Sequence, residues 1–140
     1  FARYMSNKQS DIMKRSISTS KAPAAIGPYS QAVEINGMLF VSGQIAIDPL
    51  TGKLIDGDIA EQTEQVLKNT GAILQEAGYS YNDVVKSTCI LEDIADVKAM
   101  NEVYARFYPN NYPSRAAFAV KDIPLGALIE IETIAIKKTQ

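Results

Sequence analysis

Arg115 lies in the segment Pro113-Ser114-Arg115-Ala116-Ala117, where its neighbours are all small. Small neighbours leave room beside the guanidinium, and its planar fork matches a carboxylate through two parallel hydrogen bonds. Arg115 is therefore a candidate anchor for a ligand carboxylate. The alternative is an ordinary ion pair across a sheet with Glu130 or Glu132, and spacing alone favours that alternative.

Glu130 and Glu132 are two residues apart in a segment that alternates with isoleucine. In a strand, both carboxylates point to one face while Ile129 and Ile131 point to the other. One of the two glutamates is a candidate for positioning or deprotonating a water molecule. The alternative is the solvated face of an amphipathic strand, which the spacing alone favours.

Four further residues are candidates for lining a binding site. Tyr29 follows Gly27-Pro28 on a loop, and loops on rigid scaffolds often carry binding groups. Gly43, after Ser42, would let a ligand approach backbone donors, although a strand bulge explains this glycine equally well. The amide of Asn101 would reach either a ligand or a neighbouring backbone group.

The chain contains no histidine, which limits the chemistry open to it. Ser-His-Asp and Cys-His nucleophile pairs, imidazole bases and most catalytic zinc sites are excluded. Glycine-rich phosphate loops and Cys-x-x-Cys motifs are also absent. The single cysteine, Cys89, lies in an apolar run and is expected to be a reduced, packed thiol. Chemistry must therefore rely on carboxylates, arginine, lysine, tyrosine, serine, backbone groups or water.

The bulk composition predicts one globular domain. The chain has 140 residues, of which 46% are hydrophobic, and its net charge is -2. A pI near 5.1 provides no broad positive field for a phosphate backbone, so nucleic acid is a disfavoured partner. No apolar stretch reaches the roughly 20 residues that a membrane-spanning helix needs.

The first half of the chain predicts a hairpin and a helix. An edge strand is expected over Lys14 to Ser18, and Asn36-Gly37 predicts a type I′ turn between strands 32–35 and 38–42. A turn-rich connection over 48–53 follows. Asp58 and Glu61 then form an Asp-x-x-Glu capping box that begins a helix ending at Gly78.

The second half predicts a strand, a helix and two more strands. The strand covers 84–91, Asp93 or Asp96 caps the helix, and Pro109 ends it. The final strands cover 115–121 and 127–136. This order predicts an α+β domain with a mixed sheet and both helices on one face. The other sheet face then remains uncovered, and we expect it to pack against further copies of the chain.

The N-terminal residues 1–13 are expected to be an extension, and residues 14–140 the folded domain. Residues 1–19 are rich in basic residues and serine, with Asp11 as the only acid. Two interpretations fit this composition: a remnant of a mitochondrial presequence, or a disordered lead-in. The chain is accordingly expected in the cytoplasm, with the mitochondrion as the alternative.

Five ordered motifs resemble the RidA/YjgF family over about Lys14 to Lys138. They are Ala22-Pro23-Ala24-Ala25-Ile26-Gly27-Pro28-Tyr29-Ser30-Gln31-Ala32, Val41-Ser42-Gly43-Gln44-Ile45, Asn101-Glu102-Val103-Tyr104, Pro113-Ser114-Arg115-Ala116-Ala117 and Ile129-Glu130-Ile131-Glu132. Each motif alone is weak, but the ordered set is specific.

The resemblance implies a chorismate-mutase-like fold that assembles into a homotrimer around a central sheet barrel, with ligand sites in the clefts between subunits. It also implies a cofactor-free deaminase that hydrolyses 2-iminobutanoate and 2-iminopropanoate to 2-keto acids and ammonia. Dehydratases that use pyridoxal phosphate release these imines from threonine and serine. Within that resemblance, Arg115 binds the substrate carboxylate and Glu130 orients the water. Tyr29, Ser42, Gly43 and Asn101 shape the cleft.

The chain departs from some relatives at one position. Those relatives carry cysteine two residues after the arginine, where this chain has Ala117, so a thiol role there is excluded. The resemblance also leaves alternatives open, because family members are described as endoribonucleases or translation inhibitors. A non-catalytic, chaperone-like ligand-binding protein is a third possibility.

Overall fold

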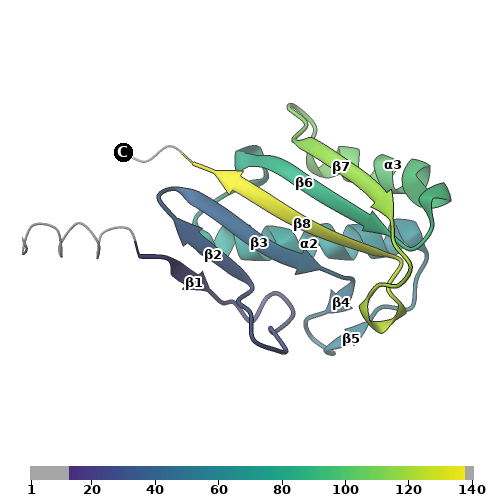
Figure 1. Cartoon of the computed structure of the whole chain (residues 1–140), viewed down its shortest axis with the longest axis horizontal. Helices are drawn as coiled ribbons and strands as arrows, with labels where there is room; N and C mark the ends of the chain where they lie inside the picture. The colour runs from purple at the N-terminus through teal and green to yellow at the C-terminus, as the bar shows by residue number, and fades with distance from the viewer. Residues whose placement is uncertain (1–12, 138–140) are drawn as a thin grey trace, which may run out of the picture.

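The computed structural model describes residues 13–137, so the predicted extension over 1–13 lies, apart from Met13, outside the described residues. The domain is built from one large sheet, a small hairpin and two helices (Figure 1). The strands are β1 (Arg15–Ile17), β2 (Ala32–Ile35), β3 (Met38–Gln44), β4 (Ile47–Asp48), β5 (Lys53–Leu54), β6 (Val84–Leu91), β7 (Ser114–Ala119) and β8 (Ile129–Ile136). The helices are α2 (Ile59–Ala77) and α3 (Val97–Phe107).

The six-stranded sheet has the order β1-β2-β3-β8-β6-β7. All neighbouring strands are antiparallel except β6 and β7, which are parallel and are connected through α3. The predicted mixed sheet is thereby confirmed. Strand β7 is an edge strand, so the residues at its outer side remain accessible.

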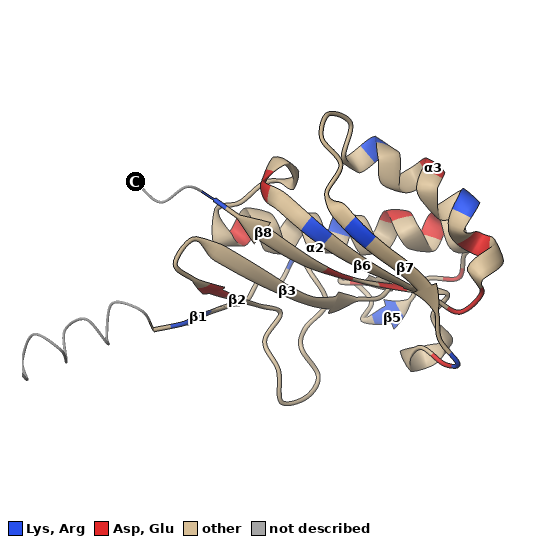
Figure 2. Ribbon diagram, turned by 45° about the horizontal axis from the view of Figure 1, so that its top comes forward, with Lys and Arg blue, Asp and Glu red and all other residues tan. Residues whose placement is uncertain are grey.

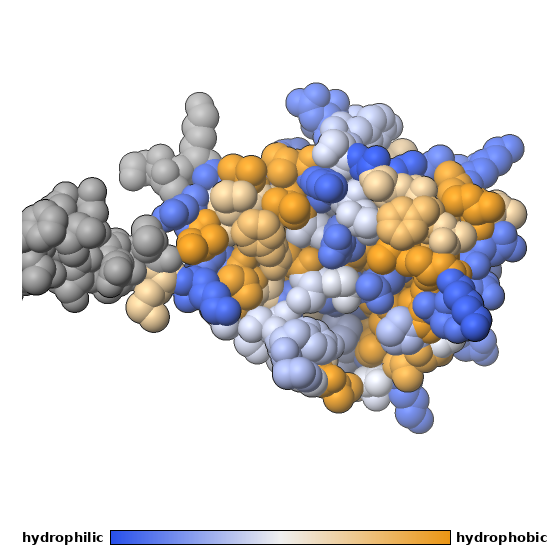
Figure 3. Space-filling model, viewed as in Figure 1, coloured by the Kyte–Doolittle hydropathy of each residue, from blue (hydrophilic) through white to orange (hydrophobic). Residues whose placement is uncertain are grey.

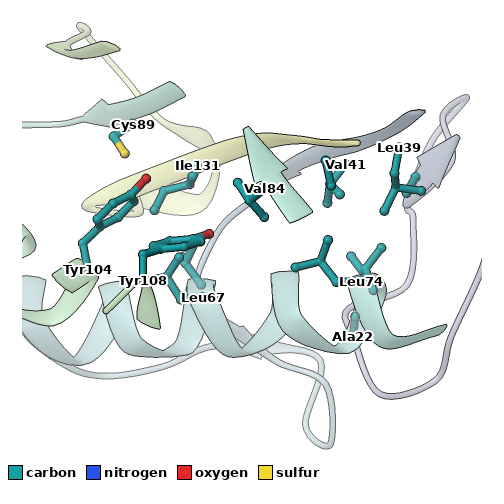
Figure 4. Packing of buried hydrophobic residues seen from close by; sticks show 14 of the residues in the cluster. Ala22, Leu39, Val41, Leu67, Leu74, Val84, Cys89, Tyr104, Tyr108 and Ile131 are labelled. Carbon is teal, nitrogen blue, oxygen red and sulfur yellow. The ribbon is translucent and has the colours of Figure 1, made fainter. Parts of the chain in front are cut away.

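Both helices cover the same face of the sheet, as predicted (Figure 1). The core lies between this face and α2, where Leu67 and Leu74 pack below Leu39, Val41 and Ile131 (Figure 4). These five side chains are at most 4% exposed. Alternating strand residues supply one side of this core, and the apolar stripe of the helix supplies the other.

The predicted turn and the predicted ends of α2 are confirmed, whereas Asp96 precedes α3 without a capping hydrogen bond from its side chain. Asn36 and Gly37 both have positive φ, at 50° and 74°, as a type I′ hairpin turn requires. The Asp58 side chain accepts a hydrogen bond from the Glu61 backbone N–H, and the Glu61 side chain accepts one from Asp58 N–H. Gly78 ends α2 with φ 84°. Local signals therefore determine where this helix begins and ends.

The structure corrects three details of the predicted elements. The connection over 48–53 contains the small β4–β5 hairpin, which was predicted only as turns. Strand β7 ends at Ala119 and not at residue 121, and β8 begins at Ile129 and not at residue 127. The backbone N–H of Val120 still bonds to Leu91 O, but the chain then turns toward the loop before β8. These strand ends depend on tertiary pairing that apolar runs do not encode.

The sheet face opposite the helices is partly apolar. Phe40, Phe118 and Ile136 are 41%, 44% and 45% exposed, and hydrophobic residues gather across this side of the molecule with polar residues between them (Figure 3). Lys and Arg do not gather into one patch in the view of Figure 2. No helix within residues 13–137 has the length and apolar character of a membrane span.

Candidate active site

Arg115 lines a pocket of about 380 Å³ between α3 and the loop before β7. We call this the Arg115 pocket, and its lining residues are Asn101, Tyr104, Ala105, Tyr112, Pro113 and Arg115. Asn101 and Tyr104 are three residues apart on α3, so their side chains lie on the same face of the helix. Two of the predicted site residues, Arg115 and Asn101, are thus brought together.

The guanidinium of Arg115 lies over the ring of Tyr104, with 5.0 Å between Cζ and the ring centroid. Within residues 13–137, no carboxylate lies within 4.0 Å of this guanidinium. The alternative ion pair with Glu130 or Glu132 is therefore not formed in the described chain. Strand β6 lies between the strands that carry these residues. The guanidinium fork remains free to bind a ligand anion.

Glu130 lines a second pocket, of about 320 Å³, at the other end of the sheet. We call this the Glu130 pocket. Its lining residues are Pro23, Ala24, Ile26, Tyr29, Gln31, Gly43, Gln44, Ile45, Ile47, Pro124, Leu125 and Glu130. The predicted residues Tyr29 and Gly43 therefore accompany Glu130. Most of the other lining side chains are apolar, so this pocket combines one carboxylate with a hydrophobic wall.

The Glu130 carboxylate lies directly against Gly43 on β3. A Cβ atom at position 43 would clash with Oε2 of Glu130 and would lie 2.8 Å from its Cδ. The register between β3 and β8 shifts between Val41 and Gln44, so a bulge surrounds this glycine. The bulge interpretation of Gly43 is correct, and the absence of a side chain also makes room for the carboxylate.

Glu130 is half-buried, and this changes its acidity. Loss of solvent raises its pKa above the usual value, and the nearby charge of Glu132 raises it further. A carboxyl with a raised pKa is a stronger base once ionised, which suits a group that deprotonates water. Glu132 is more exposed and lines neither of the two pockets described above.

Buried amides hold the loops of the Glu130 pocket. The Gln31 side chain accepts a hydrogen bond from Thr19 N at 2.7 Å and donates one to Pro23 O at 2.8 Å. The Asn69 side chain donates to Ile45 O and Ile47 O at 3.2 and 2.9 Å. Buried amides with satisfied donors fix the backbone they contact. The loop carrying Tyr29 and the chain after β3 are thereby positioned.

The Ser42 and Tyr29 side chains both hydrogen-bond to the loop over 26–30. The Ser42 hydroxyl donates to Ser30 O at 2.6 Å and is not among the residues that line either pocket. The Tyr29 hydroxyl accepts a hydrogen bond from Ile26 N at 3.4 Å, and its side chain is 54% exposed. Ser42 therefore orders the backbone beside Gly43, whereas Tyr29 is accessible at the pocket.

The two pockets open on opposite faces of the sheet. Arg115 pairs with Ser87 of β6, which is fully buried, so the arginine points toward the helix face. Glu130 alternates with the buried Ile129 and Ile131, so it points to the open face. Within one chain, the Arg115 and Glu130 side chains therefore line separate pockets.

Sequence reasoning missed the aromatic and aliphatic walls of both pockets. Tyr104 belongs to one of the five sequence motifs, but its role beside Arg115 was not predicted. Tyr112, Ile26 and Leu125 were given no role, although they are 68%, 84% and 70% exposed. A tyrosine three residues after Asn101 was the one available signal, because helix spacing places the two on one side.

The described residues offer no alternative metal or thiol chemistry. Within residues 13–137, no group of three or more Asp, Glu or Cys side chains is arranged so that it could hold a metal ion. Burial raises the pKa of Cys89 to about 11, so its thiol stays protonated, as the expected packed thiol would. What remains is a free guanidinium in one pocket and a carboxylate of raised pKa in the other.

Comparisons with known proteins show which family the chain belongs to. Residues 19–137 match the endoribonuclease L-PSP family. The Homo sapiens 2-iminobutanoate/2-iminopropanoate deaminase is 48% identical over 128 residues, which cover 91% of this chain and 93% of that protein. The solved structure of RidA from a Psychrobacter species has a TM-score of 0.85 and is 44% identical, covering 88% of this chain and 99% of that one.

A second solved structure links the two family names. The YjgF gene product of E. coli has a TM-score of 0.85 and is 38% identical, covering 89% of this chain and 99% of that one. The family match over residues 19–137 spans all five sequence motifs. The chain therefore belongs to the endoribonuclease L-PSP family, which is the RidA/YjgF family that its motifs resemble.

Proposed function

We propose that this protein is an enzyme that hydrolyses reactive 2-imino acids, in particular 2-iminobutanoate and 2-iminopropanoate. Water adds to the C=N carbon and ammonia leaves, so the products are a 2-keto acid and ammonia. The observation that carries the proposal is the free guanidinium of Arg115 at a pocket, without a protein carboxylate within 4.0 Å in the described chain. The 48% identical human relative is named for this same reaction.

Arg115 binds the substrate carboxylate in this proposal. A bidentate guanidinium–carboxylate pair fixes both the position and the rotation of the substrate. Asn101, in the same pocket, supplies an amide that can donate to the imine or the carboxylate. Because an imine carbon is already electrophilic, positioning supplies most of the required rate enhancement without a cofactor.

Glu130 holds the hydrolytic water. Its raised pKa makes the ionised carboxylate a better base for the proton that water loses as it attacks. The same carboxyl group can then return the proton to the departing nitrogen. Tyr29 and Gly43 line this part of the site, and Ser42 fixes the backbone beside Gly43.

A complete site requires two subunits in this proposal. Arg115 and Glu130 point to opposite faces of one sheet, Arg115 is on the edge strand β7, and the open face exposes Phe40 and Phe118. A neighbouring copy packed on that face would bring its Glu130 pocket to the Arg115 pocket of the first. We therefore propose a chorismate-mutase-like homotrimer with a site in each cleft between subunits.

The function is tested by generating the imine in place. A threonine or serine dehydratase releases the substrate, and semicarbazide traps the imine that has not yet been hydrolysed. The protein should accelerate imine decay, and Arg115→Ala should lower kcat/KM by about a hundredfold, the cost of two charge-assisted hydrogen bonds. Arg106→Ala, which removes an exposed arginine from α3, is the matched control. Unchanged imine decay with the unmodified protein would disprove the proposal.

RNA cleavage is the competing function, because the family description names an endoribonuclease. The absence of histidine and a net charge of -2 argue against it, since phosphate binding and general-base catalysis on RNA both lose their usual groups. The test incubates RNA with protein purified free of nucleases. Cleavage that rises in proportion to the protein and falls in Arg115→Ala would favour this alternative.

The cellular location follows from the proposed substrate. A 2-imino acid hydrolyses in water, so the enzyme should share a compartment with the dehydratase that releases it. We propose the cytoplasm, with the mitochondrion as the alternative. Fractionation of cells that express the tagged chain would distinguish the two.

A further inference from the structure

We propose that Tyr104 is a positioning residue that holds the guanidinium of Arg115 over its pocket through the face of its ring. This inference deepens the proposed function and rests on it. In this account Tyr104 acts through Arg115 and takes no part in proton transfer. It determines how well the site discriminates a carboxylate from a neutral group.

The contact itself places a cation over a π face. Arg115 Cζ lies 5.0 Å from the centroid of the Tyr104 ring, within the range of a cation–π interaction. Arg115 lies on an exposed edge strand and makes no ion pair or side-chain hydrogen bond within residues 13–137. The ring is therefore the contact that restricts where this long side chain can point.

Tyr104 is itself held rigidly. Its side chain is 3% exposed, its ring lies 4.7 Å from that of Tyr108, and its hydroxyl donates to Ser87 Oγ at 2.9 Å. Figure 4 shows the Tyr104 hydroxyl directed from α3 toward the sheet. Ser87 pairs directly with Arg115 between β6 and β7. The Tyr104 ring is thus hydrogen-bonded to the residue that lies directly beside Arg115 in the sheet.

An aromatic partner suits a carboxylate anchor better than an acidic partner would. A glutamate would fix the guanidinium through its N–H donors, and those donors would then be lost to the substrate. A ring face holds the charge without accepting the in-plane N–H groups, so all five stay available. The pocket therefore holds an arginine whose position is fixed and whose N–H donors are still free to bind a ligand.

The experiment varies the electron density of the ring while keeping its size. Tyr104→Phe removes the tether, and phenylalanines with one, two and three ring fluorines at position 104 then weaken the π face stepwise. Binding of the product 2-ketobutyrate is followed by calorimetry, alongside its neutral analogue 2-ketobutyramide. Tyr108→Phe is the control, because the Tyr108 hydroxyl has no hydrogen-bond partner in the described chain.

The proposal predicts a graded loss of carboxylate binding. The Kd for 2-ketobutyrate should rise about twofold per fluorine and about tenfold across the series, while the Kd for the amide stays constant. In the imine assay, KM should rise and kcat should change little. Equal weakening of both ligands, or a Kd that does not depend on fluorination, would overturn the proposal.

Binding separates this proposal from the proposed function. If the unmodified protein binds 2-ketobutyrate with the predicted dependence on Arg115 and Tyr104 but fails to hydrolyse imines, the deaminase function falls and the positioning role stands. If hydrolysis is observed and the fluorinated variants match the Tyr104→Phe protein, the positioning role falls alone. Absence of any carboxylate binding to the unmodified protein would overturn both. Melting temperatures of each variant confirm that the fold is kept.

Discussion

Glu130 and Gly43 are packed so closely that each restricts the other. The glycine leaves no side chain on β3, and the carboxylate of β8 occupies the vacant volume. The carboxylate is the far end of a flexible side chain, so an added methyl group can displace it at little energetic cost. Position 43 should therefore affect catalysis more than stability.

Gly43→Ala should lower kcat by about tenfold or more, because the displaced Glu130 no longer holds water at the imine carbon. The free energy of unfolding should change by less than about 1.5 kcal/mol, since only the end of one flexible, half-buried side chain moves. Steady-state imine hydrolysis and urea denaturation measure the two quantities. A variant with full kcat would show that the Gly43 contact has no catalytic consequence.

The acidity of Glu130 gives a prediction with a defined sign. The proposed mechanism needs its ionised form, and its pKa is raised by burial and by Glu132. Activity should therefore begin to fall, as pH decreases, at a pH above the usual carboxyl range. Glu132→Gln removes the second cause and should shift this fall to lower pH. The pKa of the Glu130 carboxyl, followed by carbon NMR against pH, should fall in parallel. An unchanged or higher pKa would contradict this account.

Stability has the opposite dependence on pH. A carboxyl whose pKa is raised by folding begins to destabilise the native state as pH rises above its pKa in the unfolded chain, because the unfolded chain ionises more easily, and the loss is complete above its pKa in the folded chain. Glu130→Gln should therefore be more stable than the unmodified protein near pH 7, while its activity is lost. Denaturation at pH 4 and at pH 7 should show this advantage only at the higher pH.

Turns and helix ends could be predicted from the sequence where they depend on the residue types of a few neighbouring positions. The Asn36-Gly37 turn and the Asp58 cap were predicted correctly because each depends on a few adjacent residues. The same reasoning could not find what Asn69 does, because its hydrogen bonds reach Ile45 and Ile47, more than twenty residues away. Such an amide appears in sequence only as a polar residue within a helix.

Gly71 shows the limit of helix propensity. Replacing a mid-helix glycine with alanine normally stabilises a helix by about 1 kcal/mol. Here a Cβ atom would clash with the hydroxyl of Tyr81, which donates to Leu67 O at 2.7 Å, and would lie 2.7 Å from its Cζ. The absence of a side chain at Gly71 therefore lets the half-buried Tyr81 pack against α2.

Gly71→Ala should consequently destabilise the protein by about 1–3 kcal/mol, the usual cost of overpacking. Thermal unfolding should show a lower Tm than for the unmodified chain. In a Tyr81→Leu background, which removes the hydroxyl and the outer ring, the same substitution should be neutral or stabilising. An increase in Tm for the single variant would indicate that Tyr81 moves aside freely.

For the whole molecule, the arrangement of the site could be predicted only in part. The residues Arg115, Glu130, Asn101, Tyr29 and Gly43 were all predicted, and the structure places each of them at a pocket. Their division between two faces was not predictable from spacing, because it depends on β6 lying between β7 and β8. In the proposed function, a second copy of the chain therefore completes the site.

In the proposed homotrimer, Arg115 of one subunit acts with Glu130 of the next. Arg115→Ala and Glu130→Gln chains, carrying different tags and co-expressed, are purified through both tags so that every trimer contains both. The mixed trimers should be active although each parent protein is inactive. One cleft in each mixed trimer has both groups intact, so the rate should be about one third of the wild-type rate. A mixture as inactive as its parents would show that the two residues do not share a site between subunits.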